Sequence, residues 1–208
     1  MNDAAEEDPI RQRSIVELRR YGVSYPTHLP LMGELHLRPA REIQDRALTL
    51  AAVIAASFGF PKSSALEWLE REGLSTRLAP VERSFLEHDR EEAQQFHFQV
   101  ERLYMIAWAL NIAPLVPYDE ECPNELVRQF PDLKRGEGSS AFRARAVGRP
   151  ESDIVQQCDI AYGLDWLVAN SRLLGENVRA LGPIVTHRRF ALEWTLSEQD
   201  WGDVSLDT

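Results

Sequence analysis

The sequence predicts a mainly α protein, a single helical domain of three or four long helices with several short ones. Apolar residues recur at steps of three and four over long stretches, which is the spacing of one helix face. Proline and glycine divide the 208 residues into helix-sized pieces, and clear β alternation is absent. Because 44% of the residues are hydrophobic, close to the globular average, we expect residues 8–208 to fold as one domain.

The first helix is expected to start at the Asp8-Pro9 pair, with proline in its first turn, and to end before Gly22. Residues 1–7 are expected to form a disordered tail. Residues 23–37 contain two prolines and show no helical period, so they predict an extended connector.

The central part of the sequence predicts two long helices and two short ones. Residues 39–58 and 91–110 each carry an apolar stripe at helical spacing. Between them, Ser64 and Glu67 have the spacing of a capping box, which predicts a short helix there. A second short helix is expected to begin at Pro80.

The C-terminal half also predicts both long and short helices, separated by extended or loop segments. Residues 112–118 predict a second extended connector, residues 123–130 a short helix and residues 134–140 a loop. The third long helix is expected over residues 150–174 and the last helix over residues 183–196.

The charge pattern limits the classes of partner. With 23 Lys and Arg against 33 Asp and Glu, the net charge is -10, which disfavours nucleic acid and anionic membranes. One interpretation of this charge is that it keeps the protein soluble. The alternative interpretation is that the acidic surface binds a basic protein partner. There is no Gly-rich phosphate-binding run, no histidine pair at metal spacing and no apolar stretch of membrane-spanning length, so we expect no cofactor, no metal and no membrane partner.

The two cysteines, Cys122 and Cys158, lie far apart without any Cys-x-x-Cys spacing, and the first residues do not resemble a signal peptide. We therefore expect a cytoplasmic protein. Cys122 precedes a helix start, which favours a thiolate, but the three acidic residues before it oppose that charge, so an inert thiol is expected. His187 is interpreted as a partly exposed helix residue rather than a base.

Two long helices open with the same short pattern. Arg38-Pro and Arg149-Pro are each followed by an acidic residue and an isoleucine at matching positions. Proline at the start of a helix and an acid in its first turn account for most of this echo. An internal duplication is the alternative interpretation.

Several motifs spread along the chain resemble one known family. They are Arg38-Pro with Glu42-Ile43 and Arg46, the run from Glu101 to Leu110, Arg149-Pro with Asp159, Tyr162 and Trp166, and the run from Arg188 through Trp194 to Thr208. Together they resemble the DUF4272 family, a group of uncharacterised, mainly bacterial proteins. The resemblance spans nearly the whole chain and implies a single helical domain, without implying a reaction. This chain has His187 and Gly202 where the family pattern has acidic residues.

A carboxylate and two aromatic residues, Glu101, Tyr104 and Trp108, share one face of the second long helix. A buried carboxylate needs a cationic partner, because an unpaired charge in an apolar interior costs several kcal/mol. The arginines considered as partners are Arg38, Arg46, Arg149 and Arg188. These groups form either a buried clamp that fixes helix register or a ligand site.

Asp159, Tyr162 and Trp166 repeat the same arrangement on the third long helix. If the two stripes faced each other across a cleft, the paired carboxylates would suit general acid/base catalysis or cation binding. An enzyme or small-molecule binder is therefore the alternative function, with one of Arg38, Arg149 or Arg188 holding an anionic group.

The acidic C-terminal tail carries Trp201, Asp203 and Asp207, and Trp194 lies just before it. Either these tryptophans dock against the body of the protein or Trp201 forms a partner-facing anchor inside an acidic rim. Because the sequence contains no catalytic constellation, the leading hypothesis is a non-enzymatic protein-binding domain of immunity or adaptor type.

Overall fold

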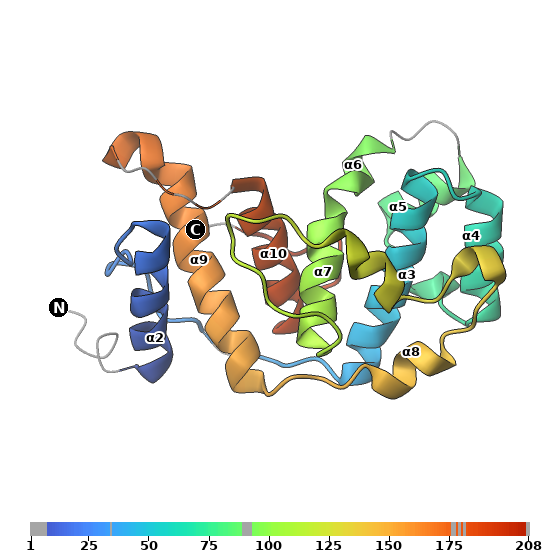
Figure 1. Ribbon diagram of the computed structural model, residues 1–208, viewed down its shortest axis with the longest axis horizontal. Helices are drawn as coiled ribbons and strands as arrows, with labels where there is room; N and C mark the ends of the chain where they lie inside the picture. Colours follow the sequence, from blue (N-terminus) through green and yellow to red (C-terminus); the bar gives the residue numbers. More distant parts are fainter. Residues whose placement is uncertain are drawn as a thin grey trace.

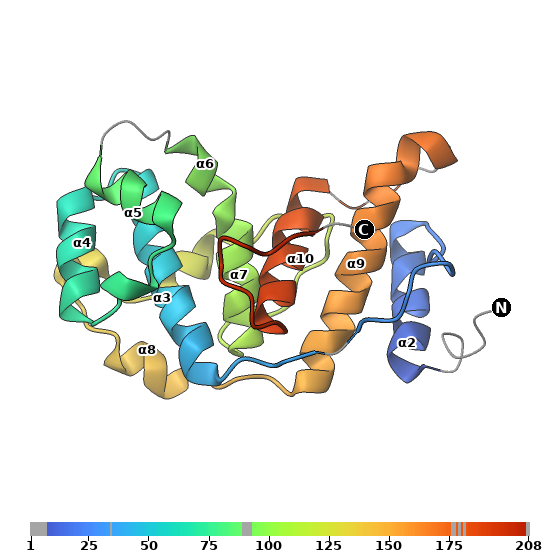
Figure 2. The same ribbon diagram turned by 180° about the vertical axis from the view of Figure 1, so that it is seen from behind.

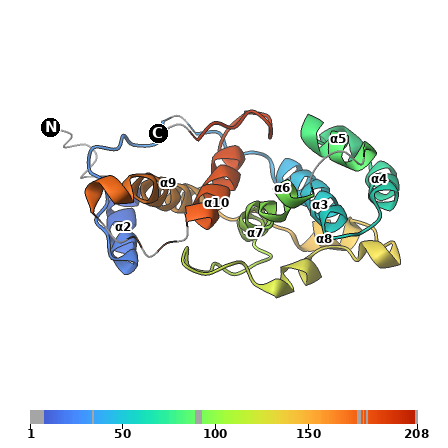
Figure 3. The ribbon, with the colours of Figure 1, turned by 90° about the horizontal axis from the view of Figure 1, so that it is seen from above.

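The helices lie side by side in a row whose order differs from their order in the sequence (Figures 1 and 3). In the computed structural model, α2 (Pro9–Leu18) packs on α9 (Glu151–Leu174), and α9 packs on α10 (Gly182–Thr195). On its other side α10 packs on α7 (Gln99–Ala109), which in turn packs on α3 (Ala40–Ser57). The last long helix of the chain therefore occupies the middle of the row.

Short helices complete the end of the row beyond α3. α4 (Lys62–Arg71) and α6 (Gln94–His97) pack on α3, and α5 (Pro80–Glu87) packs on α4. The remaining short elements are α8 (Ser140–Arg145) and the 3-10 helices η1 (Arg19–Tyr21), η2 (Ser75–Arg77), η3 (Asn124–Gln129) and η4 (Leu133–Arg135).

The structure describes residues 8–33, 35–88, 93–175, 178, 180 and 182–206, and this part of the chain contains helices and no strand. The predicted mainly α fold is confirmed. The disordered tail expected for residues 1–7 lies outside the described residues. Within the described part, no helix combines the length and the apolar character needed to cross a bilayer.

The first helix begins and ends as its sequence predicts. The Asp8 carboxylate accepts hydrogen bonds from the backbone N–H groups of Ile10 (2.7 Å) and Arg11 (3.2 Å), which caps α2. Gly22 follows η1 with a φ of 79°, a left-handed conformation that glycine adopts without strain. Residues 23–37, as far as they are described, contain no helix and run along one side of the molecule from α2 to α3 (Figure 2).

Three local predictions are wrong. The Ser64 capping box does not form, because α4 begins two residues earlier at Lys62, with Pro61 at its N-cap and no side-chain cap. The second long helix is divided into α6 and α7 at Phe98. The loop expected over residues 134–140 is partly helical, because it begins inside η4 and reaches the start of α8.

The two Arg-Pro helix starts dock in the same way. Arg38 donates its backbone N–H to the Thr195 carbonyl (3.0 Å) and its Nε–H to the Trp194 carbonyl (2.8 Å). Arg149 likewise donates its backbone N–H to the carbonyl that follows Trp108 (2.8 Å) and its Nε–H to the Trp108 carbonyl (2.6 Å).

Each of these guanidiniums also lies over the tryptophan ring, with Cζ 4.4 Å from the centroid of Trp194 for Arg38 and 4.8 Å from that of Trp108 for Arg149. The carbonyls at a helix C-terminus lack intrahelical partners and carry partial negative charge. The sequence echo therefore corresponds to one packing device, in which an arginine covers the end of α10 or of α7.

Candidate functional site

Glu101 on α7 is buried, and its partner is Arg188 on α10. Glu101 Oε2 accepts from Arg188 Nε at 2.9 Å, and Oε1 accepts the backbone N–H of Cys122 at 2.7 Å. The Arg188 side chain is fully buried and also donates to the carbonyls of Val116 (3.1 Å), Pro117 (2.9 Å) and Glu120 (2.8 Å). These contacts fasten the connector of residues 112–122 onto α7 and α10. We call this arrangement the Glu101–Arg188 clamp.

The aromatic residues of the first stripe support that clamp. The Arg188 guanidinium lies 4.7 Å from the ring centroid of Tyr104 and 5.4 Å from that of Tyr118. The Tyr104 hydroxyl donates to the Pro114 carbonyl (2.5 Å) and accepts the Val116 N–H (2.6 Å). Of the arginines considered from the sequence, Arg188 is thus the one that meets Glu101.

Asp159 on α9 has a partner that sequence reasoning missed. Arg11 on α2 donates Nη2–H to Asp159 Oδ1 (3.0 Å) and Nε–H to Oδ2 (3.2 Å), and both side chains are almost fully buried. Tyr25 donates its hydroxyl to Oδ1 (3.1 Å), and its ring approaches Gly163 so closely that an added Cβ would lie 2.6 Å from it. The remaining Arg11 donors reach the carbonyls of residues 29 and 30.

The two acidic stripes do not face each other across an open cleft. α10 lies between α7 and α9 and packs against both (Figures 1 and 3). Glu101 and Asp159 are each engaged by a different arginine, one from α10 and one from α2. This corrects the expectation of a shared cleft. Periodicity along single helices gave no information about which helix would separate them.

The second stripe's aromatic residues contact other elements. The Arg189 guanidinium lies 4.8 Å from the ring centroid of Tyr162, and Trp166 lies edge-on to His28 at 4.6 Å. Arg189 also forms ion pairs with Asp165 (2.7 Å) and Glu193 (2.6 Å).

A further buried pair, Arg46 with Glu82 (2.5 Å), joins α3 to α5. The i, i+4 spacing of Arg189 and Glu193 could have shown the Glu193 pair in advance. For contacts between residues on separate helices, no spacing in the sequence gave a comparable indication.

The C-terminal tail is docked. Trp201 is 8% exposed and lies edge-on to Phe190 (4.9 Å between centroids) and Trp194 (5.3 Å). Asp203 is exposed, and Asp207 lies outside the described residues. The acidic side chains therefore surround a tryptophan that is buried, which removes the exposed anchor considered from the sequence.

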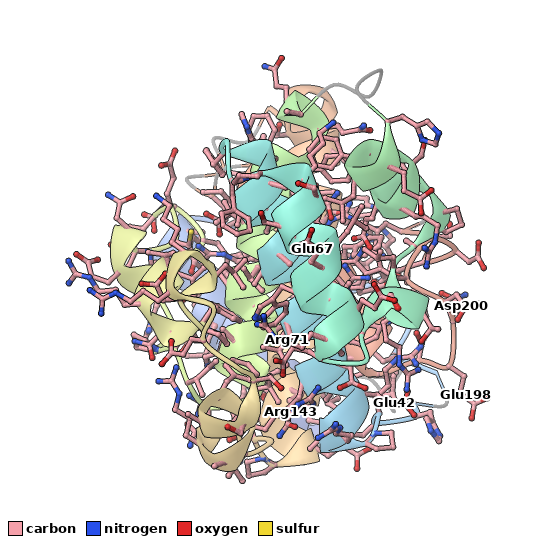
Figure 4. All side chains as sticks on the ribbon, turned by 90° about the vertical axis from the view of Figure 1, so that its right-hand side faces the viewer. Glu42, Glu67, Arg71, Arg143, Glu198 and Asp200 are labelled. Atoms are coloured by element: carbon pink, nitrogen blue, oxygen red, sulfur yellow. The ribbon has the colours of Figure 1, made fainter. Side chains whose placement is uncertain are left out.

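The exposed acids of the tail gather at one edge of the molecule. Figure 4 shows Glu198 and Asp200 of the tail on the same edge as Glu42 at the start of α3. Arg38 joins these elements, because it pairs with Glu42 and donates Nη2–H to the Gln199 carbonyl. Arg38 is therefore already engaged by groups of the protein.

A groove of about 1110 Å³ lies between α3, α6, the start of α7, residues 121–137 and the start of α10. Apolar side chains form most of it, including Leu48, Ile54, Phe58, Phe60, Phe98, Leu103, Leu126, Val127, Phe130 and Ile184. Of these, Phe58, Phe98 and Val127 are exposed. Sequence reasoning missed this groove, because it forms between segments that are remote in sequence.

Two histidines stand at the rim of the groove. His97 stacks on Phe58 (4.3 Å between centroids, planes 13° apart), and His187 lies parallel to Phe98 (6.2 Å, 5°). Burial, and then the nearby positive charge of Arg102, lowers the pKa of His187 to about 4. His187 is therefore a neutral side chain near pH 7. It is half-buried, in line with the partly exposed position expected.

Cys122 also lines the groove. Burial, and then the Glu101 carboxylate, raises the pKa of its thiol to about 12. Burial likewise raises the pKa of Cys158. Because nucleophilic attack requires a thiolate, both cysteines are inert near neutral pH, as expected for Cys122.

One family model, described as "Domain of unknown function (DUF4272)", matches residues 10–204. No curated protein and no solved structure matches the chain.

Proposed function

We propose that this chain, which belongs to the DUF4272 family, is a non-enzymatic binding domain whose groove takes a segment of a partner protein. The segment presents consecutive apolar side chains and is flanked by Lys or Arg. The observation that carries the proposal is the apolar groove with three large hydrophobic side chains exposed at its rim. Soluble proteins rarely leave such patches uncovered unless the patch has a binding role.

The size and lining of the groove fit a polypeptide segment. Phe58 just after α3, Phe98 before α7 and Val127 on η3 all line the groove, so one apolar segment would contact all of them. Aromatic residues are enriched among the side chains that dominate binding energy at protein interfaces.

One end of the groove is acidic, whereas Arg128 and Lys134 line another part of it. Asp119, Glu120 and Glu121 are consecutive and exposed, and Glu121 lines the groove. Among the described residues, none of these three side chains forms an ion pair. In a chain of net charge -10, they would attract Lys or Arg on either side of a bound segment and speed its association.

The buried carboxylates support a binding role over the alternative of a cleft enzyme. Glu101 and Asp159 are held by arginines and by further hydrogen bonds, so their oxygens are already engaged by donors of the protein. The two cysteines are both free thiols, which supports the cytoplasm as the compartment of this interaction.

A displayed random-peptide library selected on the full chain tests the proposal. We expect enriched sequences with consecutive apolar residues and flanking Lys or Arg. A labelled peptide made from the consensus should bind saturably in fluorescence anisotropy. Val127→Glu should weaken that binding at least about tenfold, which corresponds to about 1.4 kcal/mol.

The matched control is Val147→Glu. Val147 is 64% exposed against 72% for Val127, but it lies outside the groove. Binding of the consensus peptide should be unchanged in this variant. A selection that enriches nothing, an acidic consensus, or equal losses in the two variants would contradict the proposal.

A further inference from the structure

Arg102 is half-buried and, unlike the buried arginines, has no carboxylate partner among the described residues. Arg11, Arg46, Arg188 and Arg189 each pair with Asp or Glu. Among the described residues, the hydrogen bond that Arg102 forms runs from its Nε–H to His187 Nδ1, at 3.0 Å. The Nε–H group of Arg102 can only donate a hydrogen bond, so His187 Nδ1 must be the unprotonated acceptor. The neutral His187 ring therefore carries its hydrogen on Nε2.

The Arg102 guanidinium is nevertheless held in place. Its Cζ lies 3.6 Å from the ring centroid of Phe190 and 5.8 Å from that of Trp201. Contact with an aromatic face and a fixed Nε–H restrict the rotamers of the side chain. Its Nη1 and Nη2 atoms have no acceptor in the described part of the protein and are not sealed from solvent. The pair of donors that suits a carboxylate is therefore oriented and free.

The charge around Arg102 is uncompensated. Arg46 and Glu82 are the other charged groups that act on it, and they neutralise each other as an ion pair. Burial, and then repulsion from Arg46, lowers the pKa of Arg102 to about 10, so the cation is still present near pH 7. An anion placed against Nη1 and Nη2 would relieve this repulsion.

We propose that Arg102 is an anion site that binds the carboxylate of an organic acid, with His187 as its positioning residue. A planar carboxylate matches the two parallel donors of a guanidinium. A single cation balances one negative charge, whereas a phosphate dianion would need more. Arg102 does not line the groove but His187 does, so this site adjoins the proposed peptide site.

The test is an NMR titration of the full chain at pH 7 and constant ionic strength, with sodium acetate, phenylacetate or phosphate replacing sodium chloride. The probe is the Nε–H signal of Arg102, and the internal control is that of Arg11. The donors of Arg11 are occupied by Asp159 and by the carbonyls of Leu29 and Pro30. We expect a saturable shift of the Arg102 signal with both carboxylates and none for Arg11.

Two variants keep the proposal open to contradiction. Arg102→Gln should abolish the acetate response of the Trp201 indole signal, while Arg149→Gln should retain it. His187→Glu places a carboxylate within the protein beside Arg102, so it should raise the melting temperature and remove the acetate response. No saturable shift in the unmodified chain, a stronger response to phosphate, or an unchanged response in His187→Glu would overturn the site. Arg102 does not line the groove, whereas His187 does, so Arg102→Gln is the variant that tests the anion site without changing the lining of the peptide groove.

Discussion

Two neighbouring contacts between α7 and α10 differ in whether the arginine is paired with a carboxylate. Glu101 meets Arg188, and one residue further along α7 Arg102 meets His187. The first pair is sealed from solvent, neutral in sum and saturated with hydrogen bonds. The second is half-buried, carries a net positive charge and keeps free donors. A buried ion pair thus fixes the helix arrangement, while its neighbour keeps the capacity to bind.

The largest expected effect comes from breaking the sealed pair. Arg188→Met leaves the buried Glu101 carboxylate without its cation and frees three carbonyls of the 112–122 connector. Removing one partner of a buried ion pair costs about 3–5 kcal/mol. Urea unfolding should therefore show a much lower midpoint. Arg83→Ala, which breaks the exposed Arg83–Glu87 pair, is the control and should cost no more than about 1 kcal/mol.

A smaller loss is expected when the carboxylate is replaced by its amide. Glu101→Gln keeps an oxygen that can accept from Arg188 or from the Cys122 N–H, but it removes the charge. A hydrogen bond to a charged group contributes about 1.5–3 kcal/mol, and part of this should be lost from the free energy of unfolding. If the variant unfolds like the unmodified chain while losing affinity for the consensus peptide, Glu101 belongs to a binding site rather than to a clamp.

Replacing the arginine of the open pair should hardly change stability. Arg102→Gln removes the contact with Phe190 but also removes the repulsion from Arg46, so the free energy of unfolding should change by less than about 1 kcal/mol. The same urea titration as for Arg188→Met gives the comparison directly. Similar losses in the two variants would show that both arginines serve the fold.

The smallest effect is a pH dependence that belongs to His187. Its folded-state pKa of about 4 lies below the ordinary value of 6.5, so the unfolded chain binds more protons between these values. Stability should therefore fall as the pH decreases from 6.5 towards 4, and solvent reaching the half-buried ring moderates the loss.

His187→Asn keeps an acceptor for Arg102 Nε–H without titrating, so it should flatten this part of the profile. The measurement is the difference between the two unfolding profiles. Burial raises the pKa of Glu193, which acts in the opposite sense, but Glu193 is present in both proteins and its contribution cancels. Parallel profiles would contradict the assignment.

The parts of the site that could be predicted are those encoded within one helix. The spacing of Glu101, Tyr104 and Trp108 correctly indicated a carboxylate on a buried face that requires an arginine. Burial rules also placed Trp201 against the body of the protein. The sequence did not identify Arg11 as the partner of Asp159. The two residues are 148 positions apart, and no sequence pattern around either of them indicates the other.

The groove could not be predicted for the same reason. Its walls come from α3, α7, the 121–137 segment and α10, and no local pattern states that these segments meet. The exposure of apolar side chains is also difficult to predict from the sequence. Phe58 belongs to an apolar stripe that predicts burial, but it is exposed and lines the groove.

By itself the sequence determined the helical class, most helix boundaries, the two connectors and the need for buried charge pairs. Apolar periodicity, proline, glycine and desolvation cost act within a few residues of each other, so they can be read from a linear chain. The order of the helices in the row, the separation of the two acidic stripes by α10, and the choice of Arg188 rather than Arg102 as the paired cation were decided by tertiary packing. Those features depend on which distant surfaces bury each other, and that free energy is shared among segments with no common position in the sequence.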